Sequence, residues 1–253
     1  MKLTSDERKN KILHEVITKG TVSINELAGM FEVTTETIRN DVKFLQDKNL
    51  LAKKHGTVTT PNTFFENEFS VKETDNLEEK KEIADSALKF IPRNSAIFLD
   101  TSTSVFQLAK LLVMRDDLTI FTNSIQINQV LANSDNQILL TGGLFRKKSG
   151  SYVGTWALNA IKELNVDVAF IGCDGFSKKG PTIRSYHELE IKKAISEHSK
   201  KNFILCDTSK LDNEGLYSFI DYSNLDMVIM ERQLTEIERK KFPDSLLFYS
   251  NEG

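Results

Sequence analysis

Five short polar clusters stand in the last two-thirds of the chain, each at the end of an apolar run. They are rich in Asp, Asn, Ser, Thr and Gly, and they occupy residues 100–104, 122–124, 141–143, 172–175 and 207–210. Ser, Thr and Gly at the start of a helix leave backbone N–H groups that can bind a phosphate, while Asp and Asn suit sugar hydroxyls. One such cluster alone is more often an ordinary helix cap than a ligand contact. Five clusters on one edge would favour a ligand site.

The segments between these clusters predict how they are positioned. From residue 77 onward, helical patterns alternate with apolar strand patterns, which is typical of a parallel sheet flanked by helices. The predicted strands are 96–99, 118–121, 137–140, 168–171, 203–206, 227–230 and 246–249, and the predicted helices are 78–90, 105–112, 125–132, 156–164 and 188–198. Because the carboxyl ends of parallel strands share one edge, the clusters should line a common crevice.

Within this crevice, the loop of residues 100–104 is the strongest candidate for ligand contact. Lys210, at the end of the last cluster, is the cation that we expect to face a phosphate. Lys192 and Lys193 follow Glu190 on a predicted helix, and we expect both to be solvated.

A second pattern with chemical content lies at residues 33–45. Ile38, Val42 and Leu45 are spaced four and three apart, which predicts a helix with one buried face. Thr34 is a suitable N-cap. The opposite face is polar and carries Glu36, Arg39, Asn40, Lys43 and Asp47. Arg and Asn are residues that read base edges and hold phosphates in a major groove.

The flanking residues predict a small domain around this helix. A helix with an apolar stripe starts at Ser5 and ends at Gly20, and a second helix covers residues 26–31. After Asn49, two short strands surround Lys53, Lys54, His55 and Gly56. Three helices followed by a basic hairpin predict a winged helix-turn-helix. We expect Asp41 to pair with a basic neighbour or with a helix end inside this domain, because a carboxylate near DNA phosphate would be repelled.

Residues 7–59 resemble the N-terminal domain of the DeoR-type family of bacterial repressors of sugar operons. The family's Thr-Ile-Arg-Arg-Asp-Leu core is Thr-Ile-Arg-Asn-Asp-Val at residues 37–42, and its His-Gly-Gly wing is His-Gly-Thr at residues 55–57. The resemblance implies binding to operator double-stranded DNA. The candidate DNA-binding residues are Thr34, Thr35, Glu36, Thr37, Arg39, Asn40, Lys43, Lys53, Lys54 and His55. His55 is either a wing contact to the DNA backbone or a turn residue.

The sequences FLDTSTSVFQLAKLL, TNSIQINQVLA, LLTGGLF, DVAFIGCDGFS, ELEIKKAI and LCDTSKL resemble the sensor domain of the same repressors. That domain resembles ribose-5-phosphate isomerase in fold, and Ser102 stands where the family usually has glycine. The resemblance implies a phosphorylated sugar or related metabolite as effector and a homodimer or homotetramer. The candidate effector-binding residues are Asp100, Ser102, Thr103, Ser104, Asn123, Gly142, Gly143, Asp174, Gly175 and Lys210, and further family motif positions are Thr182, Glu190 and Asp207.

The chain therefore has three predicted parts: a DNA-binding domain at 1–60, a linker at 61–76 in which Phe64, Phe65 and Phe69 pack against one domain, and a sensing and oligomerisation domain at 77–253. Residues 1–60 carry a net charge of +2 and the rest carries −5, within a total of −3. This mild asymmetry favours sequence-specific docking over indiscriminate adhesion to DNA.

Composition excludes several other classes. The chain has 253 residues, and 40% are hydrophobic and 27% charged, as in an ordinary globular protein. We find no run long and apolar enough for a membrane span and no signal-peptide pattern, so we expect a cytoplasmic protein. Cys173 and Cys206 lack metal-ligand spacing, so we expect two buried thiols, no metal and no cofactor.

Two other functions are compatible with the residues. The carboxylates Asp100, Asp174, Glu188 and Glu190 could serve as acid or base in a sugar-phosphate isomerase or deaminase that carries an accessory DNA-binding domain. None is clearly paired with a second carboxylate, and His187 is the histidine near a site loop. Alternatively, the second domain serves only oligomerisation. That interpretation makes little use of the five clusters.

Overall fold

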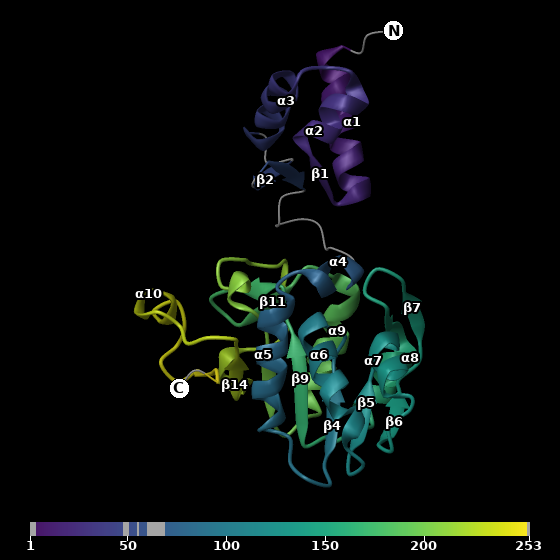
Figure 1. Ribbon diagram of the computed structural model, residues 1–253. Helices are drawn as coiled ribbons and strands as arrows, with labels where there is room; N and C mark the ends of the chain where they lie inside the picture. The colour runs from purple at the N-terminus through teal and green to yellow at the C-terminus, as the bar shows by residue number, and fades with distance from the viewer. Residues whose placement is uncertain (1–3, 48–50, 55, 60–68, 252–253) are drawn as a thin grey trace. The chain divides into compact units, whose positions relative to one another are not determined.

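The computed structural model describes residues 4–47, 51–54, 56–59 and 69–251 (Figure 1). The chain divides into two compact units, Met1–Glu66 and Asn67–Gly253. Residues 61–68 of the expected linker, with Phe64 and Phe65, lie outside the described residues. Its remaining part is structured, because residues 69–74 form a helix that belongs to the second unit.

The first unit contains three helices and a small antiparallel sheet. The elements are α1 (Ser5–Lys19), β1 (Thr21–Ser23), α2 (Ile24–Phe31), α3 (Thr35–Asp47), β2 (Ala52–Lys54) and β3 (Thr57–Thr59), with the strand order β1-β3-β2. Thr4 and Ser23 form capping boxes with Glu7 and Glu26, which fixes the starts of α1 and α2. Gly20, at φ 78°, ends α1 in a conformation that favours glycine.

The core of this unit comes from one face of each helix. Ile12 and Val16 of α1, Leu27 of α2, and Ile38 and Val42 of α3 are all fully buried. They form one cluster, to which Val58 of β3 also belongs. Three helices, the last two joined by a tight turn, followed by a hairpin make this unit a winged helix-turn-helix, as the sequence predicts.

The second unit is built on a parallel sheet of seven strands. The strands are β4 (Ala96–Leu99), β5 (Thr119–Thr122), β6 (Gln137–Leu140), β9 (Val168–Gly172), β12 (Asn202–Leu205), β14 (Met227–Ile229) and β15 (Leu247–Tyr249). Their order is β15-β14-β12-β9-β4-β5-β6, and every neighbouring pair is parallel. The predicted strands agree with these bounds to within one residue at either end.

The helices of the second unit are α4 (Phe69–Thr74), α5 (Leu77–Leu88), α6 (Thr103–Leu111), α7 (Ile125–Leu131), α8 (Gly154–Lys162), α9 (Tyr186–Glu197) and α10 (Glu236–Arg239). Of these, α5, α6 and α7 pack on one face of the sheet, and α8 and α9 pack on the other. Short 3-10 turns lie at Leu112–Met114, Thr208–Lys210 (η2) and Tyr222–Asn224. Among the described helices, none is long and apolar enough to cross a membrane.

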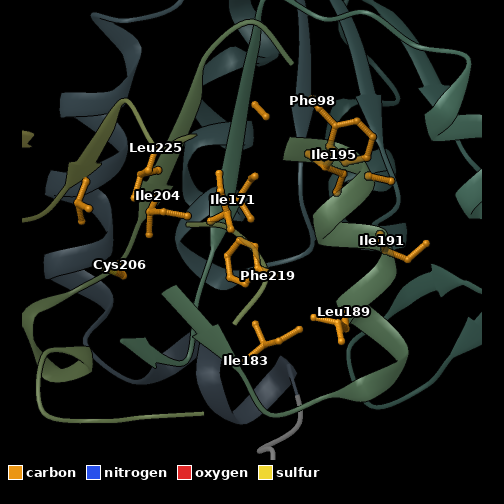
Figure 2. Close-up of a cluster of buried hydrophobic side chains, with 14 of the residues drawn as sticks. Phe98, Ile171, Ile183, Leu189, Ile191, Ile195, Ile204, Cys206, Phe219 and Leu225 are labelled. Atoms are coloured by element: carbon orange, nitrogen blue, oxygen red, sulfur yellow. The ribbon is translucent and has the colours of Figure 1, made fainter. Parts of the chain in front are cut away.

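The alternation of side chains along the strands separates two cores. Ile97 and Leu99 of β4 pack in a cluster with residues of α5, α6 and α7. Phe98, between them, packs in a second cluster with residues of α8 and α9. Figure 2 shows Phe98, Ile171 of β9 and Ile195 of α9 within this second cluster. Residues at the strand ends inherit this alternation, so Asp100 points to the same side as Phe98.

The direction in which successive strands are added to the sheet reverses between β4 and β9. From β4 the chain winds outward through β5 and β6, and from β9 it winds outward the other way through β12, β14 and β15. In open parallel sheets, ligands bind at the carboxyl edge beside such a switch point. The loops that follow β4 and β9 begin with Asp100 and Cys173, so two of the polar clusters flank it.

Small elements not predicted from the sequence complete the unit. A hairpin is formed by β7 (Leu144–Arg146) and β8 (Ser151–Val153), and a three-stranded sheet by β10 (Gly175–Phe176), β11 (Pro181–Ile183) and β13 (Tyr217–Ser218).

Phe69 of α4 is buried against Phe106 of α6, with ring centroids 5.6 Å apart. The expectation that Phe69 packs on one domain is confirmed, and that domain is the second unit.

Candidate nucleic-acid interface and strand-end site

Helix α3 presents a polar face outside the core of the first unit. The N–H of Thr37 donates to the Thr34 hydroxyl at 3.2 Å, so Thr34 caps the helix as predicted. The exposed candidate residues around this end are Thr34, Glu36, Arg39, Asn40 and Lys43, while Thr35 and Thr37 are half-buried. Short hydrogen-bonding residues at the start of an exposed helix suit entry into a major groove.

Arg39 is held only loosely within the protein. Its guanidinium lies 3.3 Å from the Glu36 carboxylate, and the two side chains are 54% and 70% exposed. Such a surface pair contributes at most about 1 kcal/mol. Arg39 can therefore exchange Glu36 for a phosphate or a base edge at little cost.

Asp41 has a structural partner. It is 4% exposed, and its carboxylate accepts a hydrogen bond from Nε of Arg8 at 2.6 Å. This ion pair ties α3 to α1. The expectation that Asp41 pairs with a basic neighbour inside the domain is confirmed.

The wing is described in part. Lys53 is exposed on β2, and Lys54 follows it in the same strand. Gly56, in the turn between β2 and β3, has φ 82°, a conformation that glycine adopts without steric cost. The candidate residue His55 lies outside the described residues.

At the strand ends, Asp100 forms a buried ion pair with Lys192 of α9. The same carboxylate oxygen, Oδ2, accepts the N–H of Gly172 at 3.1 Å, and Lys192 also donates to the carbonyl of Gly172 at 2.9 Å. The expectation that Lys192 is solvated is therefore wrong. Lys193 is half-buried and pairs with Glu190 at 3.2 Å.

The charge of Lys192 depends on this partner. Burial alone would lower the pKa of Lys192, but the Asp100 and Glu188 carboxylates outweigh it and hold the pKa above its usual value. The second oxygen of Asp100, Oδ1, is buried and has no hydrogen-bond partner among the described residues.

The loop after Asp100 starts helix α6. Ser102 caps it by accepting the N–H of Val105 at 3.1 Å. A Cβ at Gly172 would lie 2.2 Å from the Cβ of Ser102, so the serine packs directly against the glycine of the neighbouring strand. Thr103 and Ser104 are buried in the first turn of α6.

Asn123 and the two glycines follow the neighbouring strands β5 and β6. Asn123 is fully buried, and its Nδ2 donates to the carbonyl of Tyr152 at 3.4 Å. Its Oδ1 is buried and unpartnered within the described part of the chain. Gly142 and Gly143 have φ 65° and 118°, and a Cβ on Gly143 would lie 2.8 Å from the carbonyl oxygen of Val153. Gly143 is thus needed where the backbone approaches β8.

Asp174 follows β9 and holds two donors. One oxygen accepts from Nζ of Lys72 at 2.8 Å, and the other accepts the N–H of Arg184 at 3.0 Å. Burial would raise the pKa of Asp174, but Lys72 and Arg184 hold it well below its usual value. At the next position only glycine fits, because a Cβ on Gly175 would lie 2.1 Å from the carbonyl oxygen of Asn213.

Lys210 lies in η2, after β12, and is half-buried. Beside it, the buried Asp207 accepts from Nδ2 of Asn76 at 3.0 Å and from the N–H of Ser209 at 3.1 Å. The other oxygen of Asp207 has no partner among the residues described.

Lys80 of α5 is 3% exposed, and burial lowers its pKa to about 8.

Sequence reasoning missed several charged residues of this region. Lys72 lies in the segment predicted as a linker, Lys80 lies on the predicted helix 78–90, and Lys192 is expected from the sequence to be solvated. Arg146, on β7, donates to Ser149 at 2.9 Å and pairs with Glu188 at 3.3 Å. Their partners lie on other elements, so no local spacing indicates them.

The cysteines and carboxylates give little support to other chemistry. Both thiols are free, Cys206 buried and Cys173 half-buried, so the expectation of two buried thiols holds only for Cys206. Burial raises the pKa of Cys206 well above its usual value, which disfavours the thiolate. Within the described residues, no three His, Cys, Asp or Glu side chains are grouped to hold a metal ion.

Comparison with known proteins gives matches over nearly the whole chain. Residues 8–64 match the model of the DeoR-like helix-turn-helix domain, and residues 75–232 match that of the DeoR C terminal sensor domain. The glycerol-3-phosphate regulon repressor of Escherichia coli (strain K12) is 30% identical over 224 residues, 88% of this chain and 89% of that protein. The putative aga operon transcriptional repressor of Escherichia coli O157:H7 is 26% identical over 234 residues, 90% and 86% of the two chains.

Among solved structures, ribose 5-phosphate isomerase A from Methanocaldococcus jannaschii is similar over 54% of this chain and 55% of its own, with a TM-score of 0.40 and 16% identity. The two domain models match in the order in which the structure presents a winged helix-turn-helix and a parallel α/β unit. The chain belongs to the DeoR family of DNA-binding transcriptional regulators.

Proposed function

We propose that this protein represses a carbohydrate-use operon and that a phosphorylated sugar, or a related phosphorylated metabolite, controls it. Operator double-stranded DNA binds to the exposed face of α3 and to the wing. The effector binds at the carboxyl ends of β4, β5, β9 and β12. The relatives named as repressors of the glycerol-3-phosphate regulon and of the aga operon support this class.

The observation that carries the effector proposal is a set of buried acceptor oxygens that follow β4, β5 and β12 at the carboxyl edge of the sheet. Asp100 Oδ1, Asn123 Oδ1 and Asp207 Oδ2 are buried without hydrogen-bond partners among the described residues. An unpaired buried acceptor costs about 1–3 kcal/mol, so each oxygen gains from a donor brought by a ligand. Sugar hydroxyls are such donors.

Cations at the same edge suit a phosphate. Lys72 and Lys210 are half-buried near the ends of β9 and β12, and Arg184 lies beside Asp174. Lys and Arg bind phosphate by charge-assisted hydrogen bonds. The candidate set from the sequence thus gains Lys72 and Arg184 as further positive groups.

The proposal assigns no catalytic role to the strand-end carboxylates. Asp100 and Asp174 are tied to lysines, and Glu188 is tied to Arg146. The low pKa of Asp174 opposes a role as general acid near neutral pH. The relatives are likewise named as transcriptional regulators.

Repression requires two copies of the recognition helix at defined spacing. Half-sites on DNA are engaged about 34 Å apart, or a multiple of this, so we infer a homodimer or homotetramer. An effector that favours one arrangement of the sensor units then changes this spacing. A typical coupling of about 1–3 kcal/mol changes operator affinity about 5–150-fold. Because operator DNA lies in the bacterial cytoplasm, the proposal places the protein there.

The test uses the full chain and a duplex that the chain selects from a random DNA pool. Operator affinity is measured by fluorescence anisotropy at fixed salt, because salt alone changes DNA affinity. The titrants are glycerol 3-phosphate, pentose 5-phosphates, hexose 6-phosphates and hexosamine 6-phosphates, with their unphosphorylated counterparts as controls. We expect at least one phosphorylated compound to shift affinity 5-fold or more. The proposal would be refuted if the protein turned over any titrant, or if none of the titrants changed the operator affinity.

A further inference from the structure

Helix α4 is the first described element of the second unit, and the chain reaches it directly from the first unit, which ends at Glu66. Its start is fixed by Phe69, whose ring packs on Phe106 and whose N–H donates to the carbonyl of Lys148 at 3.0 Å. In sequence, α4 is thus the described helix of the second unit that lies nearest to the helix-turn-helix.

The rest of α4 and the turn after it are fastened to two neighbouring strand ends. Lys72 reaches Asp174 after β9 at 2.8 Å. Asn76, in the left-handed conformation at φ 51°, reaches Asp207 after β12 at 3.0 Å and Ser209 at 3.2 Å. Because β9 and β12 are adjacent, with Gly172 beside Leu205, the two fastenings span the middle of the proposed effector site.

The buried Lys80 of α5 holds α4 and the turn after it through hydrogen bonds to their backbone. Nζ of Lys80 donates to the backbone carbonyls of Lys72 and Asp75. Lys72 and Lys210 are both near enough to lower the pKa of Lys80, while Asp207 and Asp75 raise it. Three lysines thus gather beside two aspartates, and an anion placed among the lysines would relieve their mutual repulsion.

The Lys72–Asp174 pair is accessible in a way that the Asp100–Lys192 pair is not. The side chains of Lys72 and Asp174 are 27% and 12% exposed, against 3% and 1% for Lys192 and Asp100. If Lys72 leaves, Asp174 keeps the N–H of Arg184 as a donor. The pair can therefore open without leaving a buried carboxylate fully unpaired.

We propose that the Lys72–Asp174 ion pair couples the strand-end site to the DNA-binding unit, with the anionic group of the effector as the competitor of Asp174 for Lys72. The proposal rests on the proposed function for the identity of the competitor. A phosphate of charge near −2 attracts the ammonium more strongly than one carboxylate does. Its arrival releases Lys72 from Asp174 and frees α4 to shift.

The test measures operator affinity of the full chain, without any effector, for the wild type, K72M, D174N and the double variant. Opening the pair imitates the effector, so both single variants should move affinity at least 5-fold in one direction, the direction in which the effector moves the wild type. The double variant should differ little from either single variant, because both remove the same contact. K72R, which can keep the pair, should stay near the wild type.

Simple charge effects give the opposite pattern and so provide a control. K72M removes a positive charge and D174N a negative one, so electrostatic attraction to DNA alone would shift the two affinities in opposite directions. K81M removes the same charge as K72M from an exposed pair with Glu78 on α5 and should leave affinity unchanged. Thermal melting checks that each variant folds. If K72M does not fold, the nearly isosteric D174N alone is used to test the proposal.

Single variants within 2-fold of the wild type, or variants that shift affinity in opposite directions, would overturn the coupling by Lys72 while leaving the effector titration of the wild type as it stands. A different outcome is also possible: no phosphorylated compound changes the operator affinity of the wild type, but K72M and D174N both change it in the same direction. In that case the proposed effector class is wrong and the coupling through α4 is supported. The two proposals therefore fail separately.

Discussion

Asp100, at the end of β4, and Lys192, on α9, lie 92 residues apart in sequence and form an ion pair whose side chains are 1% and 3% exposed. Lys192 also holds the carbonyl of Gly172, and Gly172 holds Asp100, so three groups close a ring across the seam between β4 and β9. This ring fixes the loop that starts α6, and with it the geometry of the strand-end site.

Breaking the ring should destabilise the second unit strongly. K192M leaves the Asp100 carboxylate buried without its cation, and removal of one partner of a buried pair costs about 3–5 kcal/mol. Urea unfolding of the full chain, followed by circular dichroism, measures this loss. The matched control is K193M, whose lysine is 41% exposed in a pair with Glu190 and should cost at most about 1 kcal/mol. Equal losses in the two variants would contradict the structural role of Lys192.

Arg39 should matter for DNA and not for folding. R39A removes an exposed side chain, so the melting temperature should not change. If Arg39 contacts a base in bidentate fashion, operator binding weakens by about 1–3 kcal/mol. Fluorescence anisotropy on the selected duplex measures the effect. K19A, on α1 and 51% exposed, serves as the control for lost charge. A similar loss in K19A would show that only net charge counts.

Lys210 should act on the effector and not on the operator. K210A removes a cation at the end of β12, so operator affinity without effector should remain that of the wild type. The concentration of phosphorylated effector that gives half the response should rise at least 5-fold. Anisotropy titration of the preformed complex gives both quantities. An unchanged response would remove Lys210 from the candidate site.

Lys80 should make stability depend on pH in the alkaline range. Its pKa is about 8 in the folded chain, below the ordinary value of 10.5, because it is buried. Between these values the unfolded chain binds more protons at this residue, so the free energy of unfolding rises with pH, by at most about 1.4 kcal/mol per unit. The stability of the wild type relative to K80M should increase from pH 8 to pH 10 in urea unfolding. A flat difference would show that Lys80 has an ordinary pKa.

The strands and the recognition helix were predictable because their determinants are local. Polar clusters interrupt the apolar runs at Asp100, Thr122 and Thr141, and the strands end within one residue of these positions. Thr34 caps α3 within three residues of its partner. In both cases the sequence pattern and the backbone hydrogen bonds span only a few residues, so reading along the chain is sufficient.

The missed features depend on distant partners. Lys192 reads as a solvated helix residue, and its burial follows only from Asp100 in another element. Helix α4 has six residues and no repeated apolar pattern, and Lys72 finds its partner 102 residues later. The strands β10 and β13 have two residues each, too few for an alternation to be visible.

The reversal between β4 and β9 also bears on how the second unit folds. Within each half, the crossovers are short, but pairing Ile97 with Val168 closes a loop of about seventy residues, which costs more chain entropy than any neighbouring pairing in the sheet. Long closures of this kind slow folding. Because Asp100 stands on one half and Gly172, Asp174 and Lys192 on the other, the proposed effector site is complete only once β4 pairs with β9.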